Sequence, residues 1–280
     1  MPDIWNRVLE ESELISLPEV YLRLQQVLCR EDFAMQEVTE VIQYDPAITT
    51  RLLNLVRSAY LGLGPRIDTV SHAVNYLGAK SVHDLVLTTV LADSLGQIHS
   101  EGFDLKDFWH RSVNTALIAR LLGKRLQLPE AERLFIAGLV HDIGLLLMQQ
   151  VIPDEVAEIH RRCLQQQKPR HRIERELLGF DAAALGAAML ERWQLPPSLV
   201  QTTAARLEPA QAGDFSTDAA LLQLAAERAD PLPFVDDASP PVTQRLQALE
   251  LKPEDLDQAE VGAEEELGAV IRLLFPHLIG

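Results

Sequence analysis

Apolar residues recur at three- and four-residue intervals along most of the chain, and this spacing limits the fold more than any other feature. It is the period of a helix with one buried side. The strict alternation of apolar and polar residues that marks a half-buried strand is absent. The sequence therefore predicts an all-α protein.

Helix starts can be placed where a short polar side chain precedes the apolar pattern. Asp45 stands before Pro46, and Thr69 stands before an apolar stretch that ends at Gly78. Such side chains accept hydrogen bonds from the first free amides of a helix, and proline suits its first position. Helices are therefore expected after Asp45 and Thr69. Further helices are expected over 18–28, 81–95, 105–126, 157–165, 172–178, 182–193, 216–229, 240–249 and 256–274.

One stretch, 134–148, is apolar or glycine at 13 of its 15 positions. A helix that is apolar on all sides is a buried helix. The two exceptions are His141 and Asp142, which are adjacent. An uninterrupted buried helix carrying an imidazole and a carboxyl group at its middle is expected.

The charge balance restricts the partners. The chain has 25 basic and 41 acidic residues and a formal net charge of −16, which disfavours nucleic acid and anionic membranes as ligands. The two cysteines, Cys29 and Cys163, have no metal-binding spacing and are expected to be reduced and structural. No signal peptide and no apolar run of membrane-spanning length is evident, so a cytoplasmic protein is expected.

The His141–Asp142 pair resembles the motif of the HD superfamily of metal-dependent phosphohydrolases. Its surroundings are similar to the HDOD family, the HD-related output domains of bacterial signalling proteins. The resemblance covers residues 14–230 clearly. It rests on stretches that occur in the family's order: Leu17–Val20, Asp45–Ala47, Arg57–Tyr60 (where the family usually has an Asn-Ser pair), Ile67–Gly78, Phe108–Trp109, Ser112, Leu178–Asp181 and Glu191–Pro196.

The resemblance implies an N-terminal helical bundle, residues 1–98, packed on a degenerate HD-type helical bundle, residues 99–280. The glycine and polar residues between 95 and 105 are typical of a connection, so the join between the two lobes is expected there.

The resemblance also implies that most metal ligands are missing. The family's first histidine would stand directly before Ser112, where this chain has Arg111; His110 lies one residue earlier and is turned away by about 100° on a helix. The later histidine is replaced by Ala182, and a further histidine pair falls in 203–206, where none is present. The acidic ligand falls at Ala226, with Glu227 one step out of register.

Only His141 and Asp142 remain, and hydrolytic metal centres need three or more protein ligands. No metal and no cofactor are expected; if a metal bound, these two residues would hold it. An unpaired carboxylate in an apolar helix is strongly disfavoured. Arg111 is therefore expected to pair with Asp142 in the vacated metal position.

The charged segment between 160 and 172 is locally basic. Its cations, Arg161, Arg162, Lys168 and Arg170, are expected either to be a solvated loop or to attract a small anionic ligand.

The resemblance implies a non-enzymatic bacterial signalling module that acts by binding a protein or small ligand. A metal-dependent phosphohydrolase acting on a nucleotide or cyclic dinucleotide is the alternative. A helical scaffold that binds a small ligand between its lobes without turnover is a third hypothesis.

Overall fold

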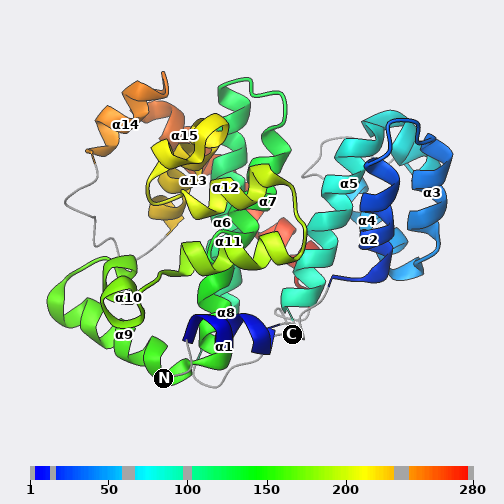
Figure 1. Cartoon of the computed structure of the whole chain (residues 1–280). Coiled ribbons are helices and arrows are strands. Elements are labelled where there is room, and N and C mark those ends of the chain that lie inside the picture. Colours follow the sequence, from blue (N-terminus) through cyan, green and yellow to red (C-terminus); the bar gives the residue numbers. More distant parts are fainter. Residues whose placement is uncertain (1–3, 13–16, 59–66, 97–102, 230–239, 277–280) are drawn as a thin grey trace. The chain divides into compact units, whose positions relative to one another are not determined.

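The computed structural model describes residues 4–12, 17–58, 67–96, 103–229 and 240–276, and within these residues the regular elements are all helices (Figure 1). The all-α prediction is confirmed. The chain divides into two compact units. Unit 1 comprises residues 1–14 and 99–267, and unit 2 comprises residues 15–98 and 268–280.

Unit 2 is built from α2 (Glu19–Leu28), α3 (Met35–Gln43), α4 (Pro46–Arg57), α5 (Val70–Gly96) and the end of α15. As predicted, the Asp45 carboxylate accepts hydrogen bonds from the amides of Ala47 (2.8 Å) and Ile48 (3.1 Å) at the start of α4. Thr69 likewise accepts one from the His72 amide (3.1 Å). Gly78 interrupts α5 with φ 82° and ψ 157°, a conformation almost confined to glycine.

Unit 1 contains the remaining elements. They are α1 (Ile4–Glu11), α6 (Leu105–Arg125), α7 (Ala131–Val140), α8 (Ile143–Val151), α9 (Pro153–Gln166), α10 (Arg170–Leu178), α11 (Ala182–Arg192), α12 (Pro197–Ala204), the short 3-10 helix η2 (Pro209–Phe215), α13 (Ser216–Ala229), α14 (Val242–Ala248) and most of α15 (Pro253–Leu274). Helix α6 packs along α7 and α13 at the centre.

Two glycines let helices of unit 1 approach very closely. A Cβ atom added at Gly138 of α7 would lie 2.4 Å from Cα of Ala116 in α6. One added at Gly144 of α8 would lie 2.0 Å from the carbonyl oxygen of Ala182 in α11. Both distances are far inside van der Waals contact, so these crossings require glycine.

The uninterrupted helix expected over 134–148 is not observed. Helix α7 ends at Val140 and α8 begins at Ile143, with His141 and Asp142 in the turn between them. Residues 131–151 are long and apolar enough, taken together, to cross a membrane, but 94% of the apolar window is buried inside the protein. A buried core explains this apolar character.

The two units differ from the expected division at 98/99. The chain does pass from unit 2 to unit 1 between residues 98 and 99. Residues 1–14, however, belong with 99–267, and residues 268–280 belong with 15–98. The predicted connection, 95–105, lies partly in 97–102, outside the described residues; α5 extends through Gly96. Helices α1, α3 and α12 were not predicted.

Candidate functional site

The turn between α7 and α8 places the Asp142 side chain against charged partners. Asp142 stands where a residue would cap α8, but its side chain makes no capping hydrogen bond. Oδ1 instead accepts hydrogen bonds from Nη2 of Arg206 (2.9 Å) and from Nη2 of Arg170. Two guanidinium groups therefore meet on one carboxylate oxygen.

The two arginines come from different parts of unit 1. Arg170 is the first residue of α10, directly after Pro169, and Arg206 follows the end of α12. The side chain of Arg206 is 10% exposed and that of Asp142 is 12% exposed. This contact is therefore a largely buried ion pair, in which removal of either partner unbalances the buried charge.

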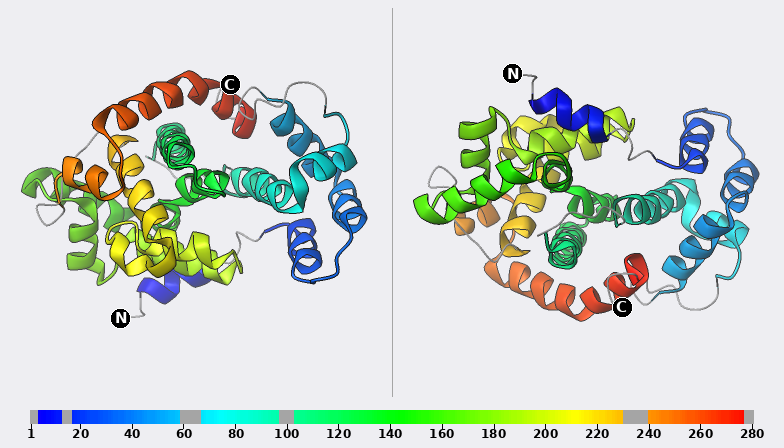
Figure 2. Two further views of the ribbon diagram at one scale, coloured as in Figure 1. Left: turned by 90° about the horizontal axis from the view of Figure 1, so that it is seen from above. Right: turned by 90° about the horizontal axis from the view of Figure 1, so that it is seen from below.

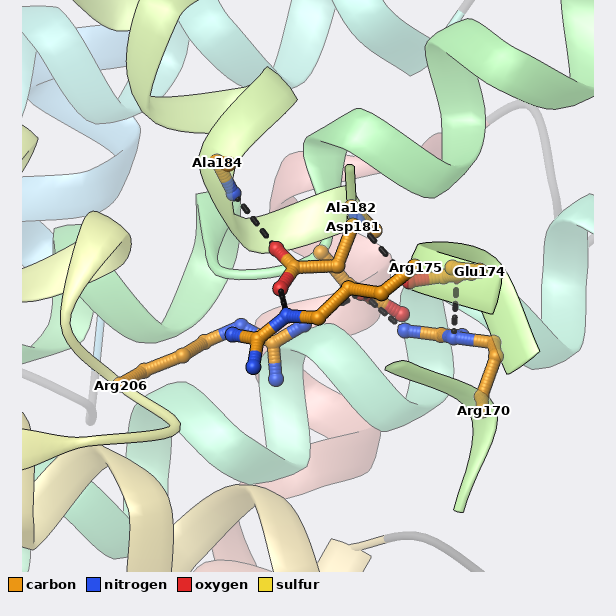
Figure 3. A network of polar contacts seen from close by, with 8 residues as sticks. Arg170, Glu174, Arg175, Asp181, Ala182, Ala184 and Arg206 are labelled. Atoms are coloured by element: carbon orange, nitrogen blue, oxygen red, sulfur yellow. Dashed lines mark hydrogen bonds and ion pairs between the residues drawn. The ribbon is translucent and has the colours of Figure 1, made fainter. Parts of the chain in front are cut away.

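Arg170 also reaches a second buried carboxyl group, Glu174, one turn along α10. Nε of Arg170 lies 3.1 Å from Oε1 of Glu174, and Oε2 of Glu174 accepts a hydrogen bond from the Ala182 amide at 2.9 Å (Figure 3). Residues four apart on a helix share one face, which explains why α10 presents both groups to the same place. Glu174 thereby connects α10 to the start of α11.

A third arginine and carboxylate lie beside this pair, as Figure 3 shows. Nε of Arg175 donates to Oδ2 of Asp181 at 2.6 Å, and Oδ1 of Asp181 accepts from the Ala184 amide at 2.9 Å, capping α11. We refer to Asp142, Arg170, Glu174, Arg175, Asp181 and Arg206 as the arginine–carboxylate network. Three guanidinium groups face three carboxyl groups, so the network is neutral when all six are ionised.

The surroundings shift the carboxyl pKa values in opposite directions. Burial alone would raise the pKa of Asp142, but Arg170 and Arg206 together outweigh burial and hold that pKa well below its usual range. Burial raises the pKa of Glu174, offset in part by Arg170 and by the Ala182 amide. Of these two carboxyl groups, Asp142 is therefore the firmly ionised one.

His141 is buried, and its ring is held by the backbone. Nδ1 lies 2.7 Å from the Gly138 carbonyl oxygen, which can only accept, so Nδ1 carries the hydrogen. Burial lowers the pKa of His141 to about 4, although the Asp142 carboxylate acts to raise it. The imidazole is therefore neutral near pH 7, with its lone pair on Nε2.

These residues do not fit a hydrolytic metal centre. The lone pair on Nε2 of neutral His141 could bind a metal, but Oδ1 of Asp142 already accepts hydrogen bonds from two guanidinium groups. A divalent cation added to the neutral network would leave two uncompensated positive charges at a buried place. Within the described residues, no group of three or more His, Cys, Asp or Glu could hold a metal ion.

The predicted Arg111–Asp142 pair is wrong. Nη1 of Arg111 lies 3.0 Å from Oδ2 of Asp107, one turn earlier on α6, and both side chains are partly exposed. Neighbours four apart on a helix find each other without any tertiary contact, which explains this local pairing. His110, the adjacent residue, is half-buried on α6. The charge that Asp142 needs comes from Arg170 and Arg206 instead.

The positions that would carry the missing ligands have other contacts. Ala182 begins α11 and donates its amide to Glu174, while its carbonyl faces Gly144. Ala226 is half-buried on α13. Its neighbour Glu227 binds Arg245 of α14 through both oxygens, at 2.9 and 2.5 Å. These contacts stabilise unit 1, and the charge of Glu227 is paired with that of Arg245.

The predicted basic segment is paired with carboxylates of the same chain. Arg161 and Arg162 both bind Glu158, and Lys168 lies 2.9 Å from Glu176. Arg170, the fourth cation, belongs to the network. Binding of an anionic ligand at these four residues stays a prediction.

Sequence reasoning missed Arg206, Glu174, Arg175 and Asp181 as site residues. The sequence held an indication for two of them: Arg206 falls in 203–206, where the resemblance places histidines, and Asp181 ends the family-like stretch Leu178–Asp181. The charge of Arg170 is evident from the sequence, but its partner Asp142, which lies 28 residues away, is not.

Comparison with known proteins gives consistent matches. A family model described as HDOD domain matches residues 14–209. An uncharacterised protein of Treponema pallidum (strain Nichols) is 24% identical over 194 residues, which span 68% of this chain but only 37% of that protein.

Two solved structures share the fold. One, from Shewanella amazonensis SB2B and provisionally named a phosphohydrolase, is 28% identical with a TM-score of 0.71, covering 95% of this chain and 97% of its own. Another, from Marinobacter aquaeolei VT8 and provisionally named a signal transduction protein, is 22% identical with a TM-score of 0.69, covering 94% of this chain and 60% of its own.

Proposed function

Because this chain belongs to the HDOD family, which is related to the HD phosphohydrolases, we propose that it is a non-enzymatic signalling module that acts in the cytoplasm by binding a protein partner. One observation carries the proposal. The carboxylate of the His-Asp motif is bound by Arg170 and Arg206, so the group that would ligate a metal serves to join α8, α10 and the end of α12.

The electrostatics of the network support a structural role for the motif. Two guanidinium groups beside Asp142 repel a divalent cation, and they already neutralise the charge that a metal would neutralise. Water activation at a metal centre also needs an open coordination position on three or more ligands. The arginine–carboxylate network offers no open coordination position and no set of three ligands that could hold a metal.

The provisional name of the Shewanella protein keeps metal-dependent phosphoester hydrolysis as the competing function. The direct test is hydrolysis of bis(p-nitrophenyl) phosphate and of a cyclic dinucleotide with Mg²⁺, Mn²⁺ or Fe²⁺. We expect the unaltered protein to match the Asp142→Ala variant, because neither assembles a metal centre.

Arg111→Ala is the matched control, because it alters an exposed ion pair outside the network. Metal-dependent turnover that persists in Arg111→Ala and disappears in Asp142→Ala would establish the protein as an enzyme and end the proposal.

A further inference from the structure

Helix α1 belongs to unit 1 but is separated along the chain from the rest of that unit. Residues 1–14 belong to unit 1, but the next residue of that unit is His99, and all of residues 15–98 belong to unit 2. Figure 2 shows α1, in dark blue, beside α11, and α1 contacts both α8 and α11. The covalent link between α1 and its docking face therefore runs through the other unit.

The contact surface of α1 is small and mixed in character. Val8 is fully buried and Leu9 is 6% exposed. The ring of Trp5 meets the ring of Phe180 edge-on, with centroids 5.0 Å apart. Phe180 directly precedes Asp181 of the arginine–carboxylate network, so the docking face and the network share the start of α11.

Two arginines bind helix ends across this contact. Nη2 of Arg7 donates to the carbonyl oxygen of Val151, the last residue of α8, at 2.9 Å. Nη1 of Arg192, in the last turn of α11, donates to the carbonyl oxygen of Leu9 near the end of α1 at 3.0 Å. The final carbonyls of any helix lack partners within that helix. Arg192 therefore recognises a helix end, whatever side chains that helix carries.

A helix of eight residues is too short to be stable in water alone, so α1 depends on this face for its structure. It lies outside the family match, which begins at residue 14. The face in turn would expose an apolar surface bordered by Phe180 and Arg192 if α1 left it. Both properties are those of an exchangeable ligand and its site.

We propose that the face of α8 and α11 covered by α1 is the docking site for an amphipathic helix of a protein partner, and that α1 competes with that helix from within the chain. This rests on the proposed signalling function and gives the partner's chemistry. The partner helix carries an aromatic residue for Phe180, two adjacent aliphatic residues in the places of Val8 and Leu9, and a C-terminal carbonyl for Arg192.

The test uses a chain lacking residues 1–12 and a fluorescent peptide of residues 1–12 as the probe. Fluorescence anisotropy should show the truncated chain binding the peptide at least about tenfold more tightly than the full chain, because the internal competitor reduces the fraction of open sites. A peptide with Val8→Asp should not bind. Arg192→Ala in the truncated chain should weaken binding severalfold, whereas Arg111→Ala should leave it unchanged.

A truncated chain that keeps its helical circular dichroism and does not bind the peptide would overturn the proposal. If the truncated chain loses its helicity, the full chain with Trp5→Ala and Val8→Ala replaces it. That variant should bind the peptide more tightly than the unaltered chain, and equal binding would show α1 to be a fixed part of unit 1.

Light scattering separates a partner from a second copy. The full chain could form a dimer that the Val8→Asp substitution dissociates. That result would assign the face to exchange of α1 between two copies, and would overturn the proposal of a separate protein partner. Peptide binding does not depend on hydrolysis. A protein that binds the peptide and also hydrolyses phosphoesters would disprove the signalling proposal while leaving the docking site intact.

Discussion

The two units treat charge differently. Unit 1 buries ionisable groups, including Arg120, Asp142, Glu174 and Arg206, and uses them to join helices distant in sequence. In the described part of unit 2, the arginine–carboxylate pairs Arg23–Glu19, Arg30–Glu37 and Arg51–Asp93 leave every partner at least 38% exposed. The buried imidazole of unit 2, His83, pairs with the adjacent carboxyl group, that of Asp84, and joins no distant helices through this pair. The comparison teaches that apolar patterning accounts for most of unit 2, whereas unit 1 also depends on which charged groups meet.

The largest expected difference between the units comes from removing one arginine from each. Arg206→Met leaves Asp142 with one of its two guanidinium partners at a buried position, and should lower the free energy of unfolding by about 3–5 kcal/mol. Arg51→Met breaks an exposed pair with Asp93 and should cost less than about 1 kcal/mol. Urea titration measures both.

Combining Arg206→Met with Asp142→Leu should recover much of the loss, because an apolar pair replaces an unbalanced charge. Equal effects of Arg206→Met and Arg51→Met would remove the contrast between the units.

Two helical glycines give the next test. Gly144→Ala in unit 1 places a methyl group 2.0 Å from a backbone oxygen, and should cost about 3 kcal/mol because neither helix can yield. Gly268→Ala in unit 2 meets only the end of the flexible Arg272 side chain, at 3.5 Å. Alanine forms helix better than glycine, so this change should stabilise by up to about 1 kcal/mol. Thermal unfolding that gave both variants the same sign would contradict the proposed packing.

A third prediction concerns acid stability. The pKa of His141 is about 4 in the folded protein and 6.5 as its ordinary value, so the unfolded chain takes up a proton first as the pH falls. Stability should decrease between pH 6.5 and 4, by on the order of 3 kcal/mol. Hydrogen exchange should show α7 and α8 losing protection before α2 to α4.

The two shifted carboxyl groups of the network, Asp142 and Glu174, are distinguishable from His141. The lowered pKa of Asp142 stabilises the protein above the ordinary carboxyl value, and that stability is lost only as the pH falls towards the folded-state pKa, below the His141 range. The raised pKa of Glu174 has the opposite sign, because acid relieves the penalty on its ionised form. His141→Asn should abolish the decrease between pH 6.5 and 4; an unchanged profile would rule out His141 as its source.

The smallest expected effect is a coupling of zero. Arg111 pairs with Asp107, so Arg111→Ala and Asp142→Ala should be additive in a double-mutant cycle, within about 0.5 kcal/mol. A larger coupling energy would show that Arg111 does reach Asp142, and would restore the pairing predicted from the sequence.

Features decided by neighbouring residues could be predicted from the sequence. The helix starts at Asp45 and Thr69 follow from contacts within four residues, and the apolar period predicts most of the later helices. The break at His141 was not predictable from periodicity, because the apolar pattern runs through it. It becomes intelligible only with Asp142 bound to arginines from α10 and from beyond α12.

The candidate site divides in the same way. The sequence indicated that Asp142 needs a positive partner, because charge burial has a known cost. It could not select Arg206 over Arg111, since the pairing depends on how helices 64 residues apart in sequence are packed. Helix α1 was not predicted for a related reason: it packs against helices α8 and α11, which are distant in the sequence.

The interleaving of the two units has a consequence for biosynthesis. Unit 1 needs α1, which is made before the rest of that unit, and Glu266 of α15, whose carboxylate lies 2.6 Å from the buried Arg120. Unit 2 needs residues 268–280, in which Phe275 is fully buried. The ribosome therefore releases neither unit in a complete form before most of α15 has emerged. Neither unit can be produced as a single contiguous fragment, and α1 spends most of translation without its docking face.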